Sequence, residues 1–484
     1  MVIDAVMTEA SVKPSWAGAI APPAQEFSRS PLSILAGAVP AELQGCLYRN
    51  GPARLERQGQ RVGHWFDGDG AVLAVQFEAG QAQATYRYVQ TAGYVAESEA
   101  NQFLYSGYGS LAPGPIWERW QAQFKNAANT SVLALPDRLL ALWEGGMPHR
   151  LDLDTLATVG VDALDSLTAN EPYSAHPKRH PQTGHIFNFG VVAGANAKLN
   201  CYRSGPDGAI EKKSSIDLNG IPLIHDFVLA DRYLVFCVPP VRLNALPAVL
   251  GFRSFSDALM WQPRHGTQLV VVDADTFEVI SWGETDAWFQ WHFGRGYIDS
   301  YGDIVLEVVR YEDFATNQHL KEVASGTIQT SVNGQLWRIR LNPQTAAIRD
   351  QVCLVPQGCE FPVVPPTADL EAAPTYLSIH APETDPTGEL FGAIAQFNPQ
   401  IDRLTIAGAG AQRYPSEPVF APNPQHPEQG WVLTVVYDGA QHCSELWIYD
   451  GALESEPLCR LALPSVIPHS FHGVWQGAKA PPQN

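Results

Sequence analysis

Seven short segments of this chain share the pattern of a β-hairpin, in which two runs of β-branched and aromatic residues flank a turn. The tips of these predicted hairpins lie near Ala79, Asp152, Pro206, Ala274, Pro343, Pro399 and Gly451. Neighbouring tips are roughly 50 to 75 residues apart, which is the length of one four-stranded propeller blade with long loops. The repeat therefore predicts an all-β fold, a seven-bladed β-propeller that carries a cap of loops and helices over one face.

A length of 484 residues would by itself favour two or three domains, but a closed repeat accommodates it in one. A hydrophobic fraction of 45%, with 10% aromatic residues, is ample for a core of that size. We therefore expect residues 31–484 to form a single propeller domain. Residues 1–30 are expected to be an N-terminal extension that is poorly ordered.

The composition excludes several classes of protein. A formal net charge of −19, without any run of Lys or Arg, argues against nucleic acid as a partner. No stretch of about 18 apolar residues is present to span a bilayer, and the N-terminus lacks the pattern of a secretory signal. The seven cysteines are scattered without a CxxC pair, as is typical of reduced thiols. We expect a cytoplasmic monomer.

Four histidines and three glutamates lie among apolar, aromatic or small residues. They are His176, His225, His292 and His472, with Glu144, Glu360 and Glu417. All except Glu144 follow a hairpin tip by roughly 17 to 24 residues, one in each repeat. Residues at one phase of a propeller repeat take equivalent places in successive blades, so six of the seven should meet at the central axis. Glu144 lies before its tip and has no such support.

Neutral imidazoles are the usual protein ligands of redox-capable transition metals. Four histidines would complete the coordination of zinc, whereas iron(II) takes six ligands and could still admit dioxygen. Buried glutamates would hold the second ring nitrogens and thereby orient the ligands. Any one of these histidines, taken alone, is more often a core residue than a ligand. Their shared phase favours the metal, and among metals Fe(2+).

Nine motifs spread from about Pro31 to Trp475 resemble the carotenoid cleavage oxygenase family, and especially its cyanobacterial apocarotenoid-cleaving members. They are GCLYRNGP (45–52), HWFDGDG (64–70), FKNAANT (124–130), LLALWEGGMPHRLD (139–152), SAHP (174–177), IHDF (224–227), CEFPVV (359–364), SEPVF (416–420) and FHGVW (471–475). The resemblance implies a catalytic propeller with iron(II) on its axis, held by the four histidines and supported by the three glutamates. Arg295 departs from the family, which commonly has Asn three residues after the third histidine.

The resemblance also implies an activity, namely the cleavage of a conjugated carbon–carbon double bond of an apocarotenoid or carotenoid with O2. The products would be two carbonyl compounds, one of them a retinal-type aldehyde. No catalytic residue beyond the metal centre is expected. Phe66, Trp143 and Phe361 adjoin the predicted metal residues and could clamp an apolar polyene, although each is about as compatible with core packing. Thr130 matches a family position that faces the open coordination site of the iron.

An apolar substrate is drawn from a membrane, and two segments are candidates for peripheral contact with one. Residues 111–124 place Ile116, Trp117, Trp120 and Phe124 on one face of a predicted helix over 116–124. Residues 239–255 form a long and largely apolar insertion. Core packing explains the first stripe about equally well.

Three other functions are also compatible with the sequence. A stilbene-cleaving oxygenase of the same family would need a polar pair that activates a phenol. An isomerase-type relative would rearrange its substrate, and a metal-free propeller would serve as a binding module. The sequence does not decide which double bond is cut, or whether isomerisation accompanies cleavage.

Overall fold

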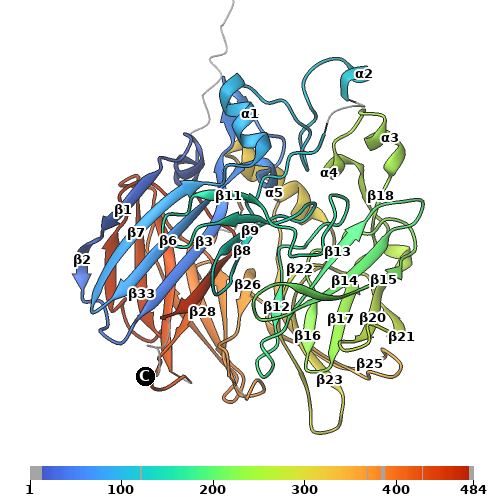
Figure 1. Ribbon diagram of the computed structural model, residues 1–484. Helices are drawn as coiled ribbons and strands as arrows, with labels where there is room; N and C mark the ends of the chain where they lie inside the picture. The colour runs from blue at the N-terminus through green and yellow to red at the C-terminus, as the bar shows by residue number, and fades with distance from the viewer. Residues whose placement is uncertain (1–12, 120–122, 368, 383–386, 428, 479–484) are drawn as a thin grey trace, which may run out of the picture.

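Seven antiparallel sheets surround one axis in the computed structural model, which describes residues 13–119, 123–367, 369–382, 387–427 and 429–478 (Figure 1). Each sheet is one blade, and its innermost strand lies beside the innermost strand of the next blade. The predicted seven-bladed propeller is confirmed.

The first three blades contain the chain up to Asp217 together with the C-terminal strand, except for one N-terminal strand that joins the last blade. From the axis outward, their strands are β35 (Gly473–Gly477), β3 (Gly45–Arg54), β6 (Asp69–Glu78), β7 (Gln81–Tyr88) and β1 (Phe27–Pro31) in blade 1; β8 (Ser131–Ala134), β9 (Leu139–Leu142), β10 (His149–Leu151) and β11 (Thr158–Val161) in blade 2; and β12 (Lys178–Arg179), β13 (Ile186–Val192), β14 (Lys198–Ser204) and β15 (Ile210–Asp217) in blade 3.

The other four blades follow in chain order. Their strands are β16 (Val228–Ala230), β17 (Tyr233–Val238), β20 (Thr267–Asp273) and β21 (Val279–Thr285) in blade 4; β22 (Phe289–Ile298), β23 (Ile304–Tyr311), β24 (Gln335–Leu341) and β25 (Ile348–Val355) in blade 5; β26 (Cys359–Val363), β27 (Thr375–Ile379), β28 (Ala393–Asn398) and β29 (Arg403–Gly408) in blade 6; and β30 (Arg413–Pro415) with β31 (Val419–Pro422), β32 (Gly430–Asp438), β33 (Cys443–Asp450), β34 (Cys459–Ala462) and β2 (Ser33–Gly37) in blade 7.

All seven predicted hairpin tips join the third and fourth strands of a blade, counted from the axis. In six of these turns an Asp or Asn side chain accepts a hydrogen bond from the backbone N–H two residues later, which stabilises a tight reversal. These side chains belong to Asp152, Asp207, Asp273, Asn342, Asn398 and Asp450. The recurring turn chemistry explains why the repeat is visible in the sequence.

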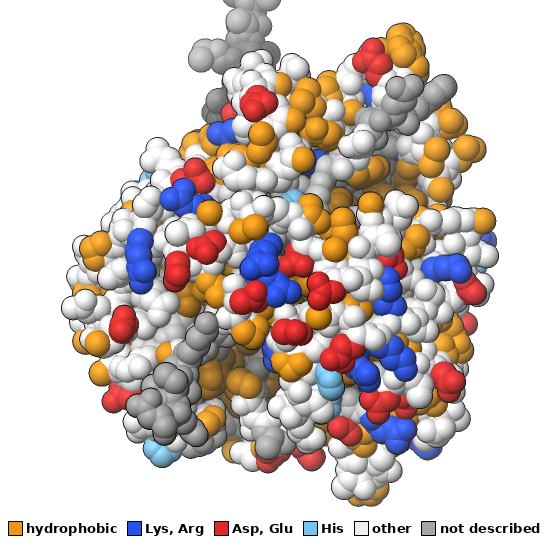
Figure 2. All heavy atoms as spheres, viewed as in Figure 1, with side chains coloured by type: hydrophobic (Ala, Val, Ile, Leu, Met, Phe, Trp, Pro, Cys, Tyr) orange, Lys and Arg blue, Asp and Glu red, His pale blue; other side chains and the backbone are white. Residues whose placement is uncertain are grey.

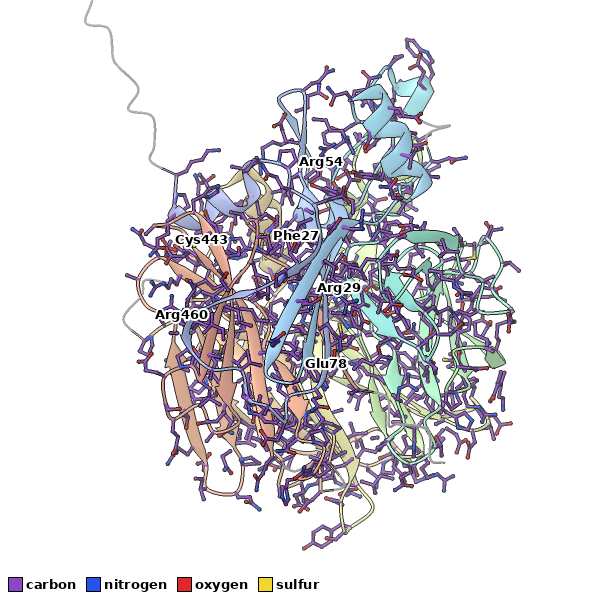
Figure 3. The ribbon with its side chains drawn as sticks, turned by 60° about the vertical axis from the view of Figure 1, so that its left-hand side comes forward. Phe27, Arg29, Arg54, Glu78, Cys443 and Arg460 are labelled. Atoms are coloured by element: carbon purple, nitrogen blue, oxygen red, sulfur yellow. The ribbon has the colours of Figure 1, made fainter. Side chains whose placement is uncertain are left out.

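The propeller is closed by pairing of its two chain ends. The C-terminal strand β35 pairs with β3 in register Leu47↔Trp475. The N-terminal strands β1 and β2 then extend the outer edges of blades 1 and 7, where they pair with β7 and β34. Figure 3 shows this arrangement, with Arg29 on β1 over blade 1 and Arg460 on β34 in the neighbouring blade. The N-terminal segment therefore spans the seam between the first and last blades.

The N-terminal extension begins to pack well before residue 31, so the expectation of poor order is wrong for residues 13–30. Trp16, in the 3-10 helix η1 (Ser15–Ile20), is fully buried, and its indole Nε1 donates to the carbonyl of Gly388 across 2.9 Å. Ile20 and Trp16 share an apolar cluster with Trp65 and Phe471. Burial of a large indole offsets the entropy of ordering this segment. Residues 1–12 lie outside the described part of the chain.

Helices and short elements gather on one face of the propeller and form the predicted cap (Figure 1). They are α1 (Ala92–Ala100), α2 (Ile116–Arg119), α3 (Ala245–Val249), α4 (Phe255–Ala258), α5 (Ala315–Ser325), η2 (Trp65–Asp67), η3 (Pro263–His265) and the strand pairs β4 (Glu56–Arg57) with β5 (Gln60–Arg61) and β18 (Val241–Leu243) with β19 (Leu259–Trp261).

The predicted helix over residues 116–124 is only partly present. Helix α2 is described over Ile116–Arg119, and Phe124 forms an isolated bridge with Ser106, which holds the backbone extended there. Trp120 lies outside the described residues. Among the described residues, no helix has the length and apolar character needed to cross a bilayer.

Candidate metal centre

Each of the seven innermost strands delivers one residue to the axis. His472, His176 and His225 lie one, two and three residues before β35, β12 and β16. His292 and Glu360 lie within β22 and β26, and Glu417 lies two residues before β31. The structure thus brings together the six residues that share one phase of the repeat. In blade 2 the equivalent place, just before β8, belongs to Thr130. The sequence repeat did not reveal this because the insertion containing α1 and α2 separates Thr130 from its hairpin tip.

The four histidine rings converge in the centre of the propeller. Their candidate ligand nitrogens all lie within 4.8 Å of one another, and all four side chains are buried. The Nε2 atom of His225 lies 2.9 Å from that of His176 and 3.3 Å from that of His292. Buried nitrogens this close to one another are the arrangement expected around a cation, and an all-nitrogen set suits a transition metal such as iron, copper, nickel or zinc.

Three of the four rings contact a glutamate through Nδ1. His292 Nδ1 lies 2.6 Å from Glu360 Oε2, and His472 Nδ1 lies 2.9 Å from Glu417 Oε1. A longer separation of 3.4 Å joins His225 Nδ1 to Glu144 Oε1. A proton on each Nδ1 leaves the lone pair of Nε2 free toward the axis. Glu360 and Glu417 therefore set both the orientation and the tautomer of His292 and His472.

Glu144 reaches the site from the loop between β9 and β10, which explains why it breaks the phase of the repeat. Its Oε1 atom is buried and also lies 3.8 Å from His176 Nε2. Burial raises the pKa of this carboxyl well above its ordinary value. His176 has no carboxylate at Nδ1 and is the one ring without such a partner among the described residues.

Burial also keeps two of the rings neutral. It lowers the pKa of His176 and His225 well below the ordinary value, and the neighbouring histidines add to this effect. Burial likewise lowers the pKa of His472, which Glu417 only partly offsets. For His292, burial is outweighed by the Glu360 carboxylate, and the pKa rises.

Several residues that support the site have no place in the sequence repeat, and the sequence alone did not single them out. Tyr311 donates its hydroxyl to the second oxygen of Glu360 across 3.0 Å. Arg49 is fully buried and donates to the backbone carbonyl of Glu417 across 2.7 Å. Asp226, beside His225, accepts from the backbone N–H of Phe293 across 3.0 Å and so ties two of the histidine-bearing segments together. Arg49 and Asp226 stand within recognisable motifs, but only the fold shows what they contact.

The backbone is irregular at two residues of the site, His292 and Phe361. The pairing of β22 with β23 shifts register on both sides of Phe293, so His292 sits next to a bulge that re-aims its side chain. Arg295 points elsewhere and pairs with Glu307 across 2.9 Å, so its departure from the family pattern leaves His292 in place. Phe361 has a φ of 57°, a left-handed conformation that is costly for an aromatic residue and typical of functional sites.

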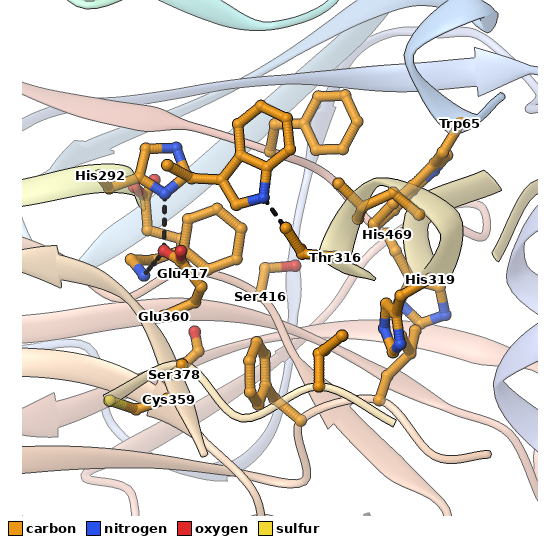
Figure 4. Close-up of a pocket in the computed structure, with 18 of the residues that line it drawn as sticks. Trp65, His292, Thr316, His319, Cys359, Glu360, Ser378, Ser416, Glu417 and His469 are labelled. Carbon is orange, nitrogen blue, oxygen red and sulfur yellow. Dashed lines mark hydrogen bonds and ion pairs between the residues drawn. The ribbon is translucent and has the colours of Figure 1, made fainter. Parts of the chain in front are cut away.

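A large cavity opens beside the histidines. The space beside the histidines amounts to about 1060 Å³ when its open mouth is counted with it. Phe66, Thr130 and Phe361 line it together with Trp291. Phe361 lies against His292 with ring centroids 5.2 Å apart, and Phe66 meets Trp291 edge to face at 5.5 Å. Figure 4 shows His292, Glu360 and Glu417 at one side of this cavity.

Trp143 does not line the large cavity. It borders a second cavity of about 310 Å³ on the other side of Phe66, together with Tyr108 and Lys125. Phe66 contacts both spaces and separates them. Of the four residues predicted to line the substrate site, the structure therefore places three together and Trp143 beyond Phe66.

Four imidazoles on the axis of a seven-bladed propeller, open to an apolar cavity, define an oxygenase of the carotenoid-cleaving class. The family model for RPE65, retinal pigment epithelial membrane protein, matches residues 20–477, and the chain belongs to this RPE65/carotenoid oxygenase family of enzymes.

Individual relatives are similar over nearly the full chain. Apocarotenoid-15,15'-oxygenase from Synechocystis is 31% identical over 452 residues, covering 91% of each protein. Resveratrol cleavage oxygenase 1 from Aspergillus fumigatus is 25% identical and covers 96% of this chain and 95% of its own length. The crystal structure of cobalt-substituted Synechocystis ACO superposes with a TM-score of 0.87 at 30% identity, covering 96% of this chain and 98% of that one.

Proposed function

We propose that this chain is a non-heme iron(II) dioxygenase that cleaves a conjugated carbon–carbon double bond of an apocarotenoid or carotenoid to give two carbonyl products, one of them a retinal-type aldehyde. The observation that carries the proposal is the convergence of four buried imidazoles beside a large cavity lined by aromatic rings. The similarity to an apocarotenoid oxygenase at 31% identity supports this substrate class.

The residues present fit an iron ion. His176, His225, His292 and His472 would hold it, and a nitrogen set with carboxylates behind three rings suits a redox-capable metal. When bound, iron(II) supplies the activation of dioxygen. Cobalt occupies the metal site of a solved relative, which supports a metal in this fold.

The surrounding residues position the substrate and exclude water. Phe66, Trp291 and Phe361 form flat walls beside the histidines, where a polyene can lie with one double bond next to the metal. In blade 2, Thr130 occupies the position at the axis that a histidine or glutamate occupies in each of the other six blades. Its hydroxyl lies 3.1 Å from Asn129 Oδ1. Glu360 and Glu417 are engaged by the histidines, so neither carboxylate is free to act as a general base.

The proposal is tested by incubating iron-loaded protein with an apocarotenal under ¹⁸O₂ and identifying the products by mass spectrometry. We expect two carbonyl fragments and label from dioxygen. Recovery of a rearranged, uncleaved substrate would instead support an isomerase. If the full-length protein retains no iron after anaerobic loading and turns over no substrate, the result would favour a binding module.

A stilbene-cleaving activity is the second candidate, because a resveratrol cleavage oxygenase is 25% identical over nearly the whole chain. The small cavity beyond Phe66 is lined by Lys125 and by two tyrosines, Tyr105 and Tyr108. The Lys125 ammonium is bound by Asp69 and Glu97, each at 2.9 Å, and the Tyr108 hydroxyl donates to Asn317 across 2.9 Å. Lys125 and Tyr108 are thus already engaged by the protein, which places stilbene cleavage second. If the protein cleaves resveratrol faster than the apocarotenal, stilbene cleavage becomes the first candidate and apocarotenoid cleavage the second.

We also propose peripheral membrane contact through the cap, with the protein remaining a cytoplasmic monomer. Figure 2 shows hydrophobic side chains gathered over α2 and α3. The exposed fractions are 64% for Trp117, 68% for Leu246, 71% for Val249 and 64% for Phe252. Interfacial binding scales with buried apolar area, and this cluster crowns the same cap as the two predicted segments.

Sedimentation with phosphatidylcholine vesicles tests that contact. Leu246→Glu combined with Phe252→Glu should release the protein from the vesicles. Val159→Glu, at a residue 66% exposed on β11, is the matched control and should leave binding unchanged. Equal binding of both variants would contradict the proposal.

A further inference from the structure

The side of the large cavity away from the metal centre carries a group of polar residues that the proposed chemistry does not use. His319 on α5, His380 after β27, Glu389 and His469 line the cavity there. Figure 4 shows His319 and His469 across the cavity from His292 and Glu360. Leu320, Val332, Leu390 and Phe391 line the same cavity and give it apolar walls beside these groups.

Backbone carbonyl groups fix the tautomer of two of these rings. His319 Nδ1 lies 2.8 Å from the carbonyl oxygen of Thr330, and His469 Nε2 lies 2.9 Å from that of Trp16. A carbonyl can only accept, so each of these nitrogens carries the proton. The opposite nitrogens, Nε2 of His319 and Nδ1 of His469, are therefore lone-pair acceptors.

Neither acceptor receives a hydrogen bond from any described residue of the chain. Burial lowers the pKa of His469 to about 4 and lowers that of His319, so both rings are neutral near pH 7. His64 is the contrasting case, because its Nδ1 accepts from Phe66 N across 3.1 Å while its Nε2 contacts the carbonyl of Asn317 at 3.3 Å. The two cavity nitrogens lack such a partner among the described residues, so a molecule that enters the cavity can supply one.

The remaining polar groups complete a site for a hydroxyl. Glu389 Oε2 accepts from Tyr414 across 2.7 Å, and its Oε1 adds a further acceptor. His380, whose ring lies 4.8 Å from that of Phe391, makes no hydrogen bond through either ring nitrogen within the described part of the chain. Its single N–H is thus available as a donor. A hydroxyl group both donates and accepts one hydrogen bond, and this set of groups matches it.

We infer that this end of the cavity binds a hydroxyl group at the terminus of the polyene, with the O–H donating to His319 or His469 and the oxygen accepting from His380. The inference rests on the proposed function and specifies its substrate as a hydroxylated polyene. Because the acceptors have no partner among the described residues, a hydrocarbon or an ether at this place leaves them unpaired in an apolar environment, which is how polar sites discriminate between substrates.

The test compares three polyenes that differ only at this terminus, carrying a hydroxyl, a methyl ether or hydrogen. The ether can accept but cannot donate. For the wild-type protein we expect kcat/KM for the alcohol to exceed that for the ether by about tenfold, the effect of one hydrogen bond. His319→Leu should lower kcat/KM for the alcohol about tenfold and leave that for the hydrocarbon unchanged, whereas His319→Gln, which keeps an acceptor, should restore part of the preference.

Gln318→Leu is the control, since Gln318 is exposed on the same helix and its side chain donates to Glu322 on the helix surface. Equal kcat/KM for the alcohol and the ether in the wild type, or an equal loss for all three substrates in His319→Leu, overturns the inference. If His319→Leu does not fold, the comparison of alcohol with ether decides alone.

Failure of the proposed function gives a different result. A wild-type protein that cleaves none of the three substrates overturns the proposed cleavage. Quenching of tryptophan fluorescence by the polyenes then tests the site by itself, with tighter binding of the alcohol supporting the inference and equal binding overturning it.

Discussion

His469 donates its Nε2 hydrogen to the carbonyl oxygen of Trp16 across 2.9 Å, so the N-terminal segment holds in place a side chain that lines the large cavity. The two residues are 453 positions apart in the chain. The contact also explains the tautomer of His469. It joins the two ends of the chain, so the same contact that helps to close the propeller also positions a residue of the cavity.

Replacement of Trp16 by Ala should destabilise the protein by about 3 to 5 kcal/mol, because a fully buried indole is lost along with its hydrogen bond to Gly388. The free energy of unfolding from urea titration measures this. Lys13→Ala, at an exposed position in the same segment, should change it by less than about 0.5 kcal/mol. Equal stability of the two variants would show that residues 13–20 do not pack in solution.

Substitution of His225 by Ala should abolish iron retention, since this ring lies next to both His176 and His292 on the axis. Iron content after anaerobic loading and desalting, measured by plasma mass spectrometry, provides the test. His265→Ala is the control, because His265 is exposed in η3. A His225→Ala protein with wild-type iron content and full activity would sink the assignment of the metal centre.

Glu360→Gln should weaken iron affinity by about 10- to 100-fold, because an amide holds the His292 ring less firmly than a carboxylate does. Tyr311→Phe, which removes the donor to the other carboxylate oxygen, should give a smaller loss. Competition with a chelator ranks the three proteins. Unchanged affinity in Glu360→Gln would mean that this carboxylate does not support the ligand.

The free energy of unfolding of the metal-free protein should decrease as the pH is lowered below about 6.5. Burial lowers the pKa of His64 to about 3, so the unfolded chain binds a proton at this residue before the folded protein does. Its contribution is fully present above the unfolded pKa of about 6.5 and is lost between about 6.5 and 3, with a slope of up to about 1.4 kcal/mol per pH unit. Urea titrations at pH 7.5, 5.5 and 4.5 measure this slope. His64→Gln should flatten it, and an unchanged slope in that variant would assign the pH dependence to other groups.

The metal centre could be predicted from the sequence because a propeller repeats its geometry with its sequence. Asp or Asn turns mark the blades, so the spacing alone places residues at one phase, such as His292 and Glu417, on one axis. The helix predicted over residues 116–124 does not include Gln123 and Phe124, because a stripe of aromatic residues does not specify a helix when tertiary pairing of Phe124 holds the backbone extended.

The sequence by itself determined the fold class, the number of blades, the four histidines and their family. The spacing of the turns indicates the blades and the axial residues, and local motifs indicate the family. Only the tertiary structure decided that Thr130 completes the axial ring, that Trp143 lies beyond Phe66, and that Trp16 reaches His469. These relationships depend on long insertions and on contacts between the two ends of the chain, which no periodicity encodes. Hydrogen-bond partners such as Thr330 and Trp16 set the chemistry of the cavity, and they become neighbours of His319 and His469 only in the folded protein.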